Sequence, residues 1–172
     1  GATADKVLQP DPGTDLALML GMIYTIIEEG LWDAEFVDTY TNDPGLKQLA
    51  AHVRGGNNQG IPYTPQWAEQ ICGVPAADIR ALAIEYATTP RAGIVSGHGL
   101  EGRTNVTQTT RALRILRIIT GHLDRVGCDI FTPKSPDRDG DFTLISHMVP
   151  GFVPEHPTKM FHVPPYNHPD CS

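Results

Sequence analysis

The chain has 172 residues, of which 40% are hydrophobic and 19% charged, as is typical of a globular domain with its own core. A net charge of −7 without a basic run argues against nucleic acid as a partner. No apolar stretch reaches the roughly 18–20 residues that cross a bilayer, so we expect no membrane insertion. Cys72, Cys128 and Cys171 form no CxxC pair, which predicts free thiols.

The N-terminal part predicts a short strand and two helices. "DKVLQP" favours a strand ending at Gln9, because the following proline cannot donate to a sheet. A helix then begins near Thr14, a good N-cap, and ends before Gly30. Apolar residues recur on one face of this helix: Leu16, Leu20, Ile23 and Ile27. Asp33 predicts the cap of a second helix, "AEFVDTY".

The middle of the chain predicts a loop and two further helices. The loop, residues 53–63, is rich in Gly and Asn. Thr64 as N-cap, Pro65 at the first helical position and Gly73 as the stop delimit one helix. The next helix starts after Pro75, and its predicted inner face consists of Ile79, Leu82, Ala83 and Tyr86.

The third part predicts a strand followed by a glycine-rich turn and a helix. "AGIVSGHG" has the pattern of a buried strand, and "NVTQTTRALRILRIITG" that of an amphipathic helix ended by Gly121. The inner stripe of this helix is Ala112, Ile115, Leu116 and Ile119. This order predicts an α/β fold in which a parallel-type sheet is flanked by helices, as in dinucleotide-binding domains.

The C-terminal part predicts little regular structure. "HLDRVGCDIF" leads to a short strand and "FTLISHMV" to another, but no sustained period follows Pro133. The domain division is therefore an α/β segment over residues 1–133 and an irregular, proline-rich extension over residues 134–172.

The turn "PDPGTD" is the first candidate site. A glycine turn before a helix allows a phosphate to approach Gly13 and the free amides at the helix start. The carboxylate of Asp15 accepts from paired N–H donors, such as a guanine edge presents. The alternative is that Thr14 and Asp15 only cap the helix and complement its dipole, and the local sequence favours this alternative.

The turn "SGHGLEGRTN" is the second candidate site. Gly97, Gly99 and Gly102 have the GxGxxG spacing, without the acidic residue that a Rossmann fingerprint carries about 20 residues later. Arg103 can bind a phosphate or a carbonyl, and His98 can donate a hydrogen bond. The alternative, a glycine turn beside a solvated arginine, is again favoured by the local sequence.

Three other groups of residues do not indicate a catalytic or binding site. Arg111, Arg114 and Arg117 repeat along one helix, where pairing with acidic neighbours is expected. "IEEG" offers no acid–base partner. The histidines of the tail have no helix or hairpin to make them converge on a metal: His147, His156, His162 and His168. We therefore predict neither catalytic nor metal-binding residues in this chain.

Several motifs in order resemble the molybdopterin oxidoreductases, the dimethyl sulfoxide reductase family. "ADKVLQPDPGTDLALMLGMIYTIIEEGLWDAEFVDTYT" is similar to the family's Pro-Gly-Thr-Asp turn and Ala/Leu-rich helix. "YTPQWAEQICGVPAADIRALAIEYATTPRAGIVSGHGLEGRTN" and "RALRILRIITGHLDRVGCDIF" are similar to the segments that follow. The resemblance covers about residues 2 to 131, and it is specific because the motifs occur together.

The resemblance implies that this chain is an incomplete piece of a larger, multidomain enzyme. Such enzymes bind molybdenum or tungsten between two pyranopterin guanine dinucleotides, and most carry an iron–sulfur cluster on a cysteine motif absent here. The implied parent catalyses two-electron redox chemistry, oxygen-atom or hydride-type transfer, on a small substrate. The isolated chain is expected to be inactive. Its partners would be the remainder of the catalytic subunit, with an electron-transfer subunit left open, in the cytoplasm or the periplasm.

The resemblance also assigns residues to the cofactor. Gly13, Thr14 and Asp15 fall on the family's contact to one guanine dinucleotide. Gly97, His98, Gly99 and Arg103 fall on the glycine turn near the second pterin. Cys128 stands where many members have glycine, which predicts a less close contact there.

Two alternatives stay open. Relatives with the same scaffold hydrate their substrates or transfer hydroxyl groups, and the chain can also be a separate nucleotide-binding or interaction module without metal.

Overall fold

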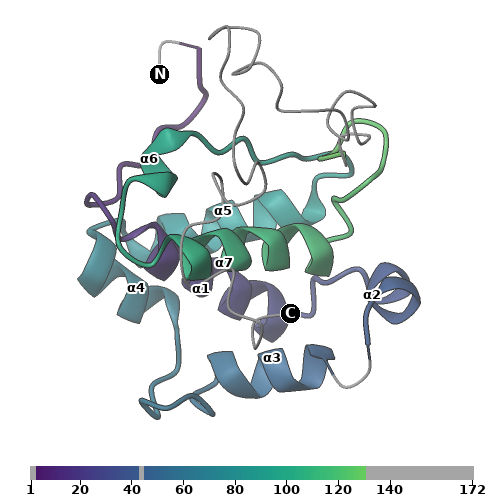
Figure 1. The fold of residues 1–172 in the computed structure, drawn as a ribbon, viewed down its shortest axis with the longest axis horizontal. Coiled ribbons are helices and arrows are strands. Elements are labelled where there is room, and N and C mark those ends of the chain that lie inside the picture. The colour runs from purple at the N-terminus through teal and green to yellow at the C-terminus, as the bar shows by residue number, and fades with distance from the viewer. Residues whose placement is uncertain (1–2, 43–44, 131–172) are drawn as a thin grey trace, which may run out of the picture. The chain divides into compact units, whose positions relative to one another are not determined.

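The computed structural model describes residues 3–42 and 45–130, and these residues form a helical unit (Figure 1). The helices follow in chain order as α1 (Asp15–Glu28), α2 (Ala34–Tyr40), α3 (Gly45–Val53), α4 (Pro65–Cys72), α5 (Ala76–Thr88), α6 (His98–Glu101) and α7 (Val106–Ile119). None of the described helices is long and apolar enough to cross a membrane.

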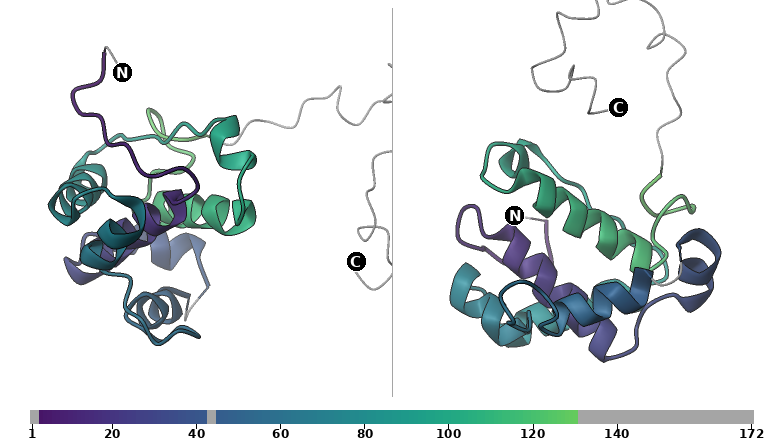
Figure 2. Two further views of the ribbon diagram at one scale, coloured as in Figure 1. Left: turned by 90° about the vertical axis from the view of Figure 1, so that its left-hand side faces the viewer. Right: turned by 60° about the horizontal axis from the view of Figure 1, so that its bottom comes forward.

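The core is built around α1, which packs against α3, α4, α5 and α7 (Figures 1 and 2). Apolar residues lie on most sides of α1, so that it is buried by several neighbours at once. A Cβ added at Gly21 would lie 3.0 Å from the Ala68 Cβ and 3.2 Å from the Ile79 Cγ2. The missing side chain therefore lets α4 and α5 approach α1 closely.

The helix boundaries were largely predictable. The Thr64 hydroxyl accepts from the Trp67 amide at 3.1 Å, and the Asp33 carboxylate accepts from the Phe36 amide at 2.9 Å. Glycines with positive φ follow α1, α4 and α7, as expected: Gly30, Gly73 and Gly121. The predicted inner faces of α5 and α7 also pack in the core or against it.

The predicted N-cap at Thr14 is wrong in its chemistry. Thr14 does precede α1, but its hydroxyl donates to the Asp11 carbonyl at 2.6 Å and accepts no amide of the first turn. Its backbone amide donates to the same carbonyl at 3.1 Å. Thr14 therefore stabilises the turn before the helix, while the helix start lacks a side-chain cap.

The predicted α/β fold with a parallel-type sheet is also wrong for the described residues, which contain no sheet. The "DKVLQP" segment is not a strand, and residues 92–97 run extended without a neighbouring strand. In the "HLDRVGCDIF" segment only an isolated bridge joins Leu123 and Asp129. A short apolar run gives an extended backbone, but it does not supply the partner that a sheet requires.

Two of the helices were not predicted from the sequence. The helix α3 covers one side of α1, and the short helix α6 lies within the predicted glycine turn (Figure 1). The "FTLISHMV" strand and the irregular extension over residues 134–172 lie outside the described residues.

Candidate functional site

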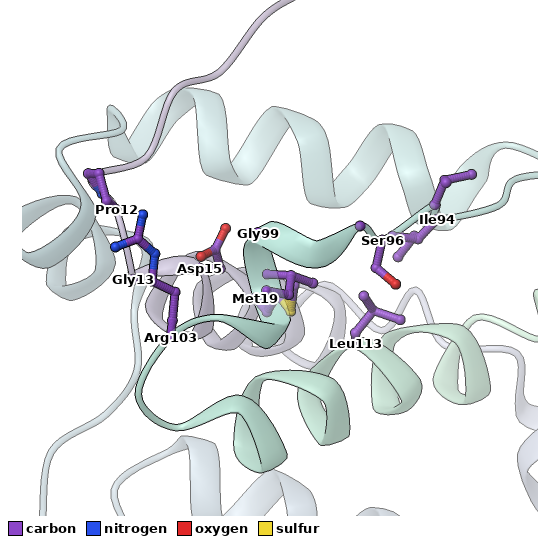
Figure 3. Close-up of a pocket in the computed structure, with 12 residues that line it drawn as sticks. Pro12, Gly13, Asp15, Met19, Ile94, Ser96, Gly99, Arg103 and Leu113 are labelled. Atoms are coloured by element: carbon purple, nitrogen blue, oxygen red, sulfur yellow. The ribbon is translucent and has the colours of Figure 1, made fainter. Parts of the chain in front are cut away.

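The two predicted turns lie together on one open pocket of about 460 Å³ (Figure 3). The pocket lies at the start of α1, and the extended segment 94–97, α6 and α7 also border it. It is lined by Pro12, Gly13, Asp15, Met19, Ile94, Val95, Ser96, Gly97, Gly99, Leu100, Arg103 and Leu113. The turns meet although the predicted sheet edge is absent, because α1 packs against α7 and α6 precedes α7.

The pocket includes five of the seven predicted binding residues: Gly13, Asp15, Gly97, Gly99 and Arg103. Thr14 and His98 are next to it in the chain but are not among the lining residues. Sequence reasoning missed Met19 and Leu113 because apolar positions on a helix face are read as core. The Ile94–Ser96 segment was read as a strand, which hid its role as a wall.

The first turn is held by its own backbone and by α4. The Asp11 amide donates to the Cys72 carbonyl at 2.9 Å, which fixes the turn to the end of α4. Gly13 has a φ of +88°, a conformation that disfavours any residue with a Cβ. This conformation directs the chain from the turn into α1.

The second turn has glycines that its own conformation does not require. Gly97 has a φ of −125°, which any residue adopts, and α6 contains Gly99. A Cβ added at either position would meet no atom within 4 Å. The open space above both glycines therefore allows a ligand to reach the backbone of the turn.

Two opposite charges face the pocket. Figure 3 shows the Arg103 guanidinium beside Pro12 and Gly13, and the Asp15 carboxylate between this end and Gly99. Neither charge forms a hydrogen bond or ion pair with another described residue. A guanidinium binds phosphate oxygens, and a carboxylate accepts from adjacent N–H donors. The pocket thus has both groups available for a polar ligand.

The other titratable groups give no second centre in the described ranges. No cluster of three or more His, Cys, Asp or Glu side chains is placed to hold a metal ion there. Arg117 pairs with Asp129, its Nε lying 2.8 Å from the Asp129 Oδ2, whereas Arg111 contacts Gln108. The four tail histidines lie outside the described residues.

Comparisons with known proteins agree with the sequence motifs. No protein-family model matches the chain. The chain is 38% identical over 129 residues to dimethyl sulfoxide reductase DmsA of Haemophilus influenzae, covering 69% of the chain and 16% of that protein. It is 36% identical over 150 residues to DmsA of Escherichia coli, covering 81% of the chain and 18% of that protein.

A solved structure supports the same relationship. Acetylene hydratase from Pelobacter acetylenicus aligns with a TM-score of 0.62 and 35% sequence identity, over 70% of this chain and 15% of that one. The chain spans less than a fifth of the length of the two DmsA proteins. It belongs to the dimethyl sulfoxide reductase family of molybdopterin enzymes.

Proposed function

We propose that this chain is a cofactor-binding segment of a molybdenum or tungsten oxidoreductase and that its pocket binds a pyranopterin guanine dinucleotide. One observation carries the proposal: two turns far apart in the sequence line the same pocket. The resemblance assigns these turns to different pterins of the cofactor, and we propose that in this pocket both contact one dinucleotide. The larger enzyme would carry any iron–sulfur cluster elsewhere and pass electrons to a partner subunit.

The residues present fit the dinucleotide. The Arg103 guanidinium suits its diphosphate, since phosphate oxygens accept bidentate hydrogen bonds. The Asp15 carboxylate suits the guanine edge, where two adjacent N–H groups donate. The bare backbone at Gly97 and Gly99 leaves room for a bulky ligand. Thr14 would contribute through its backbone, and His98 would contribute from the edge of the pocket.

When bound, the cofactor supplies a metal that exchanges two electrons with a small substrate. This chain's residues would bind and orient the dinucleotide arm. None of them is proposed to react with substrate, so catalysis would require the other parts of the enzyme.

The proposal is tested by titrating guanosine diphosphate into the ¹⁵N-labelled chain. We expect the amide signals of residues 13–15 and 97–103 to shift. Asp15→Ala and Arg103→Gln should each weaken binding by about tenfold, as expected for a lost charge-assisted hydrogen bond. Arg114→Gln is the matched control, because Arg114 is exposed on α7 and is not among the residues that line the pocket. Shifts that are unaffected by both pocket substitutions would contradict the proposal.

A non-redox parent is the second candidate, and the acetylene hydratase relationship favours it. The same pocket would serve a hydratase or a hydroxyl transferase, because holding the cofactor does not depend on the reaction. The full-length protein distinguishes the two: a redox enzyme reduces or oxidises an artificial electron-carrying dye in step with its substrate, and a hydratase does not.

A further inference from the structure

One wall of the pocket is held by a pair of charged side chains. The Ile94 amide donates to the Asp129 Oδ2 at 2.9 Å, and the Arg117 guanidinium donates to the Ile94 carbonyl. The Arg117 Nε lies 2.8 Å from the same Asp129 oxygen, a contact that is electrostatic because it lacks hydrogen-bond alignment. The side chains of Asp129 and Arg117 are only 18% and 19% exposed. We call this pair the clamp.

The clamp satisfies both backbone groups of Ile94, which a neighbouring strand would do in a sheet. In the described part of the chain, no strand lies beside residues 92–97. Buried or half-buried backbone groups need partners, and here two side chains provide them. Ile94 itself is half-buried against the core, whereas the next residue, Val95, is 99% exposed. The clamp therefore fixes this segment at Ile94, where the chain passes from the core to the exposed Val95.

The clamp is itself fixed by backbone structure. Arg117 lies in the last turn of α7, which packs on α1. The Asp129 carbonyl accepts from the Asp124 amide at 2.6 Å, which closes the turn that carries the carboxylate. The carboxylate also lies against Gly93, where an added Cβ would lie 3.7 Å from its Oδ1, an ordinary van der Waals contact. The position of Ile94 thus follows that of α7.

We propose that Asp129 and Arg117 are positioning residues that set the place of the 94–97 wall and hence the affinity of the pocket for its ligand. Neither residue lines the pocket, so they act through Ile94. The inference rests on the proposed function for the identity of the ligand but not for the mechanical role of the pair.

The test compares Asp129→Ala and Asp129→Asn in the full 172-residue chain. Asparagine keeps an oxygen acceptor for the Ile94 amide and loses the charge that holds Arg117, whereas alanine loses both. Hydrogen exchange of the Ile94 amide should be at least about tenfold faster in Asp129→Ala, with Asp129→Asn between it and the unsubstituted chain. Exchange in α1 and α5 should not change. A general loss of stability would instead make exchange faster in these helices as well.

Guanosine diphosphate gives the second measurement. Its dissociation constant should rise at least about threefold in Asp129→Ala and less in Asp129→Asn. Asp124→Asn is the matched control, because it removes a carboxylate from the same turn, and asparagine tolerates the φ of +57° found there. It should leave both Ile94 exchange and binding unchanged.

The outcomes separate the two proposals. Ile94 exchange that is unchanged in Asp129→Ala overturns the clamp. Faster exchange with unchanged affinity also overturns it, because the wall would then not govern binding. If the unsubstituted chain shows no response to guanosine diphosphate, the proposed function fails for this chain, and exchange at residues 94–97 still decides the mechanical role.

Discussion

At the scale of single residues, the glycines of the two turns have different reasons to be glycine. Gly13 needs its positive φ, so its identity is explained by the fold. Gly97 has an ordinary extended conformation and no neighbour within 4 Å of an added Cβ. No described neighbour therefore requires a glycine at this position, which agrees with the proposal that a ligand approaches its backbone.

This difference predicts opposite effects of alanine. Gly13→Ala should lower the free energy of unfolding by about 1–2 kcal/mol, the cost of a left-handed residue with a Cβ. Gly97→Ala should change it by less than about 0.5 kcal/mol, as for an unstrained surface position, but weaken guanosine diphosphate binding. Urea unfolding and ligand titration measure the two effects. A large loss of stability in Gly97→Ala would show that the fold, and not a ligand, requires this glycine.

At the scale of elements, most helices were predictable, α3 and α6 excepted, and the strands were not. The start and stop of α4 depend on Thr64, Pro65 and Gly73, which act within one turn of chain. A strand depends instead on a partner that the local sequence does not contain. Ile94 shows the consequence, since its backbone is held by Asp129, 35 residues away. The two turns of the candidate site are local motifs that the sequence displays, while the wall between them depends on distant contacts.

The Thr64 hydroxyl caps α4, whereas the Thr14 hydroxyl does not cap α1. The cap at Thr64 gives a prediction at the scale of elements. Thr64→Ala should lower the free energy of unfolding by about 1 kcal/mol, because the Trp67 amide loses its acceptor. Thr64→Ser keeps the hydroxyl and should restore most of that loss. Thermal or urea unfolding measures both variants. Equal stability of Thr64→Ala and Thr64→Ser would mean that the hydroxyl does not stabilise α4.

At the scale of the whole described unit, a few polar groups are enclosed by one apolar core. The Tyr86 ring packs edge-on against His122, with 4.9 Å between ring centroids. The Tyr86 hydroxyl is buried, and the side chain of Thr120 is the polar group that interacts with it. Burial raises the pKa of the Tyr86 phenol above its ordinary value of 10.0, because the phenolate is poorly solvated there.

This shift makes stability depend on pH in the alkaline range. Above pH 10.0 the unfolded chain releases the phenol proton while the folded chain retains it, so the free energy of unfolding falls as pH rises. The contribution is fully present below the pKa of the unfolded phenol. Urea unfolding across this range should show a shallower fall in Tyr86→Phe. Tyr40→Phe, at a ring position 72% exposed, is the control and should keep the original slope.

The clamp has a consequence for how the shape of the pocket changes in evolution. Backbone ladders in a sheet form with almost any side chains, so their geometry survives most substitutions. The position of the 94–97 wall instead depends on two side chains, those of Arg117 and Asp129. A single mutation at either position can therefore change the affinity of the pocket without changing a residue that touches its ligand. Natural variation in ligand affinity among close relatives should accordingly map to these two positions as well as to the pocket lining.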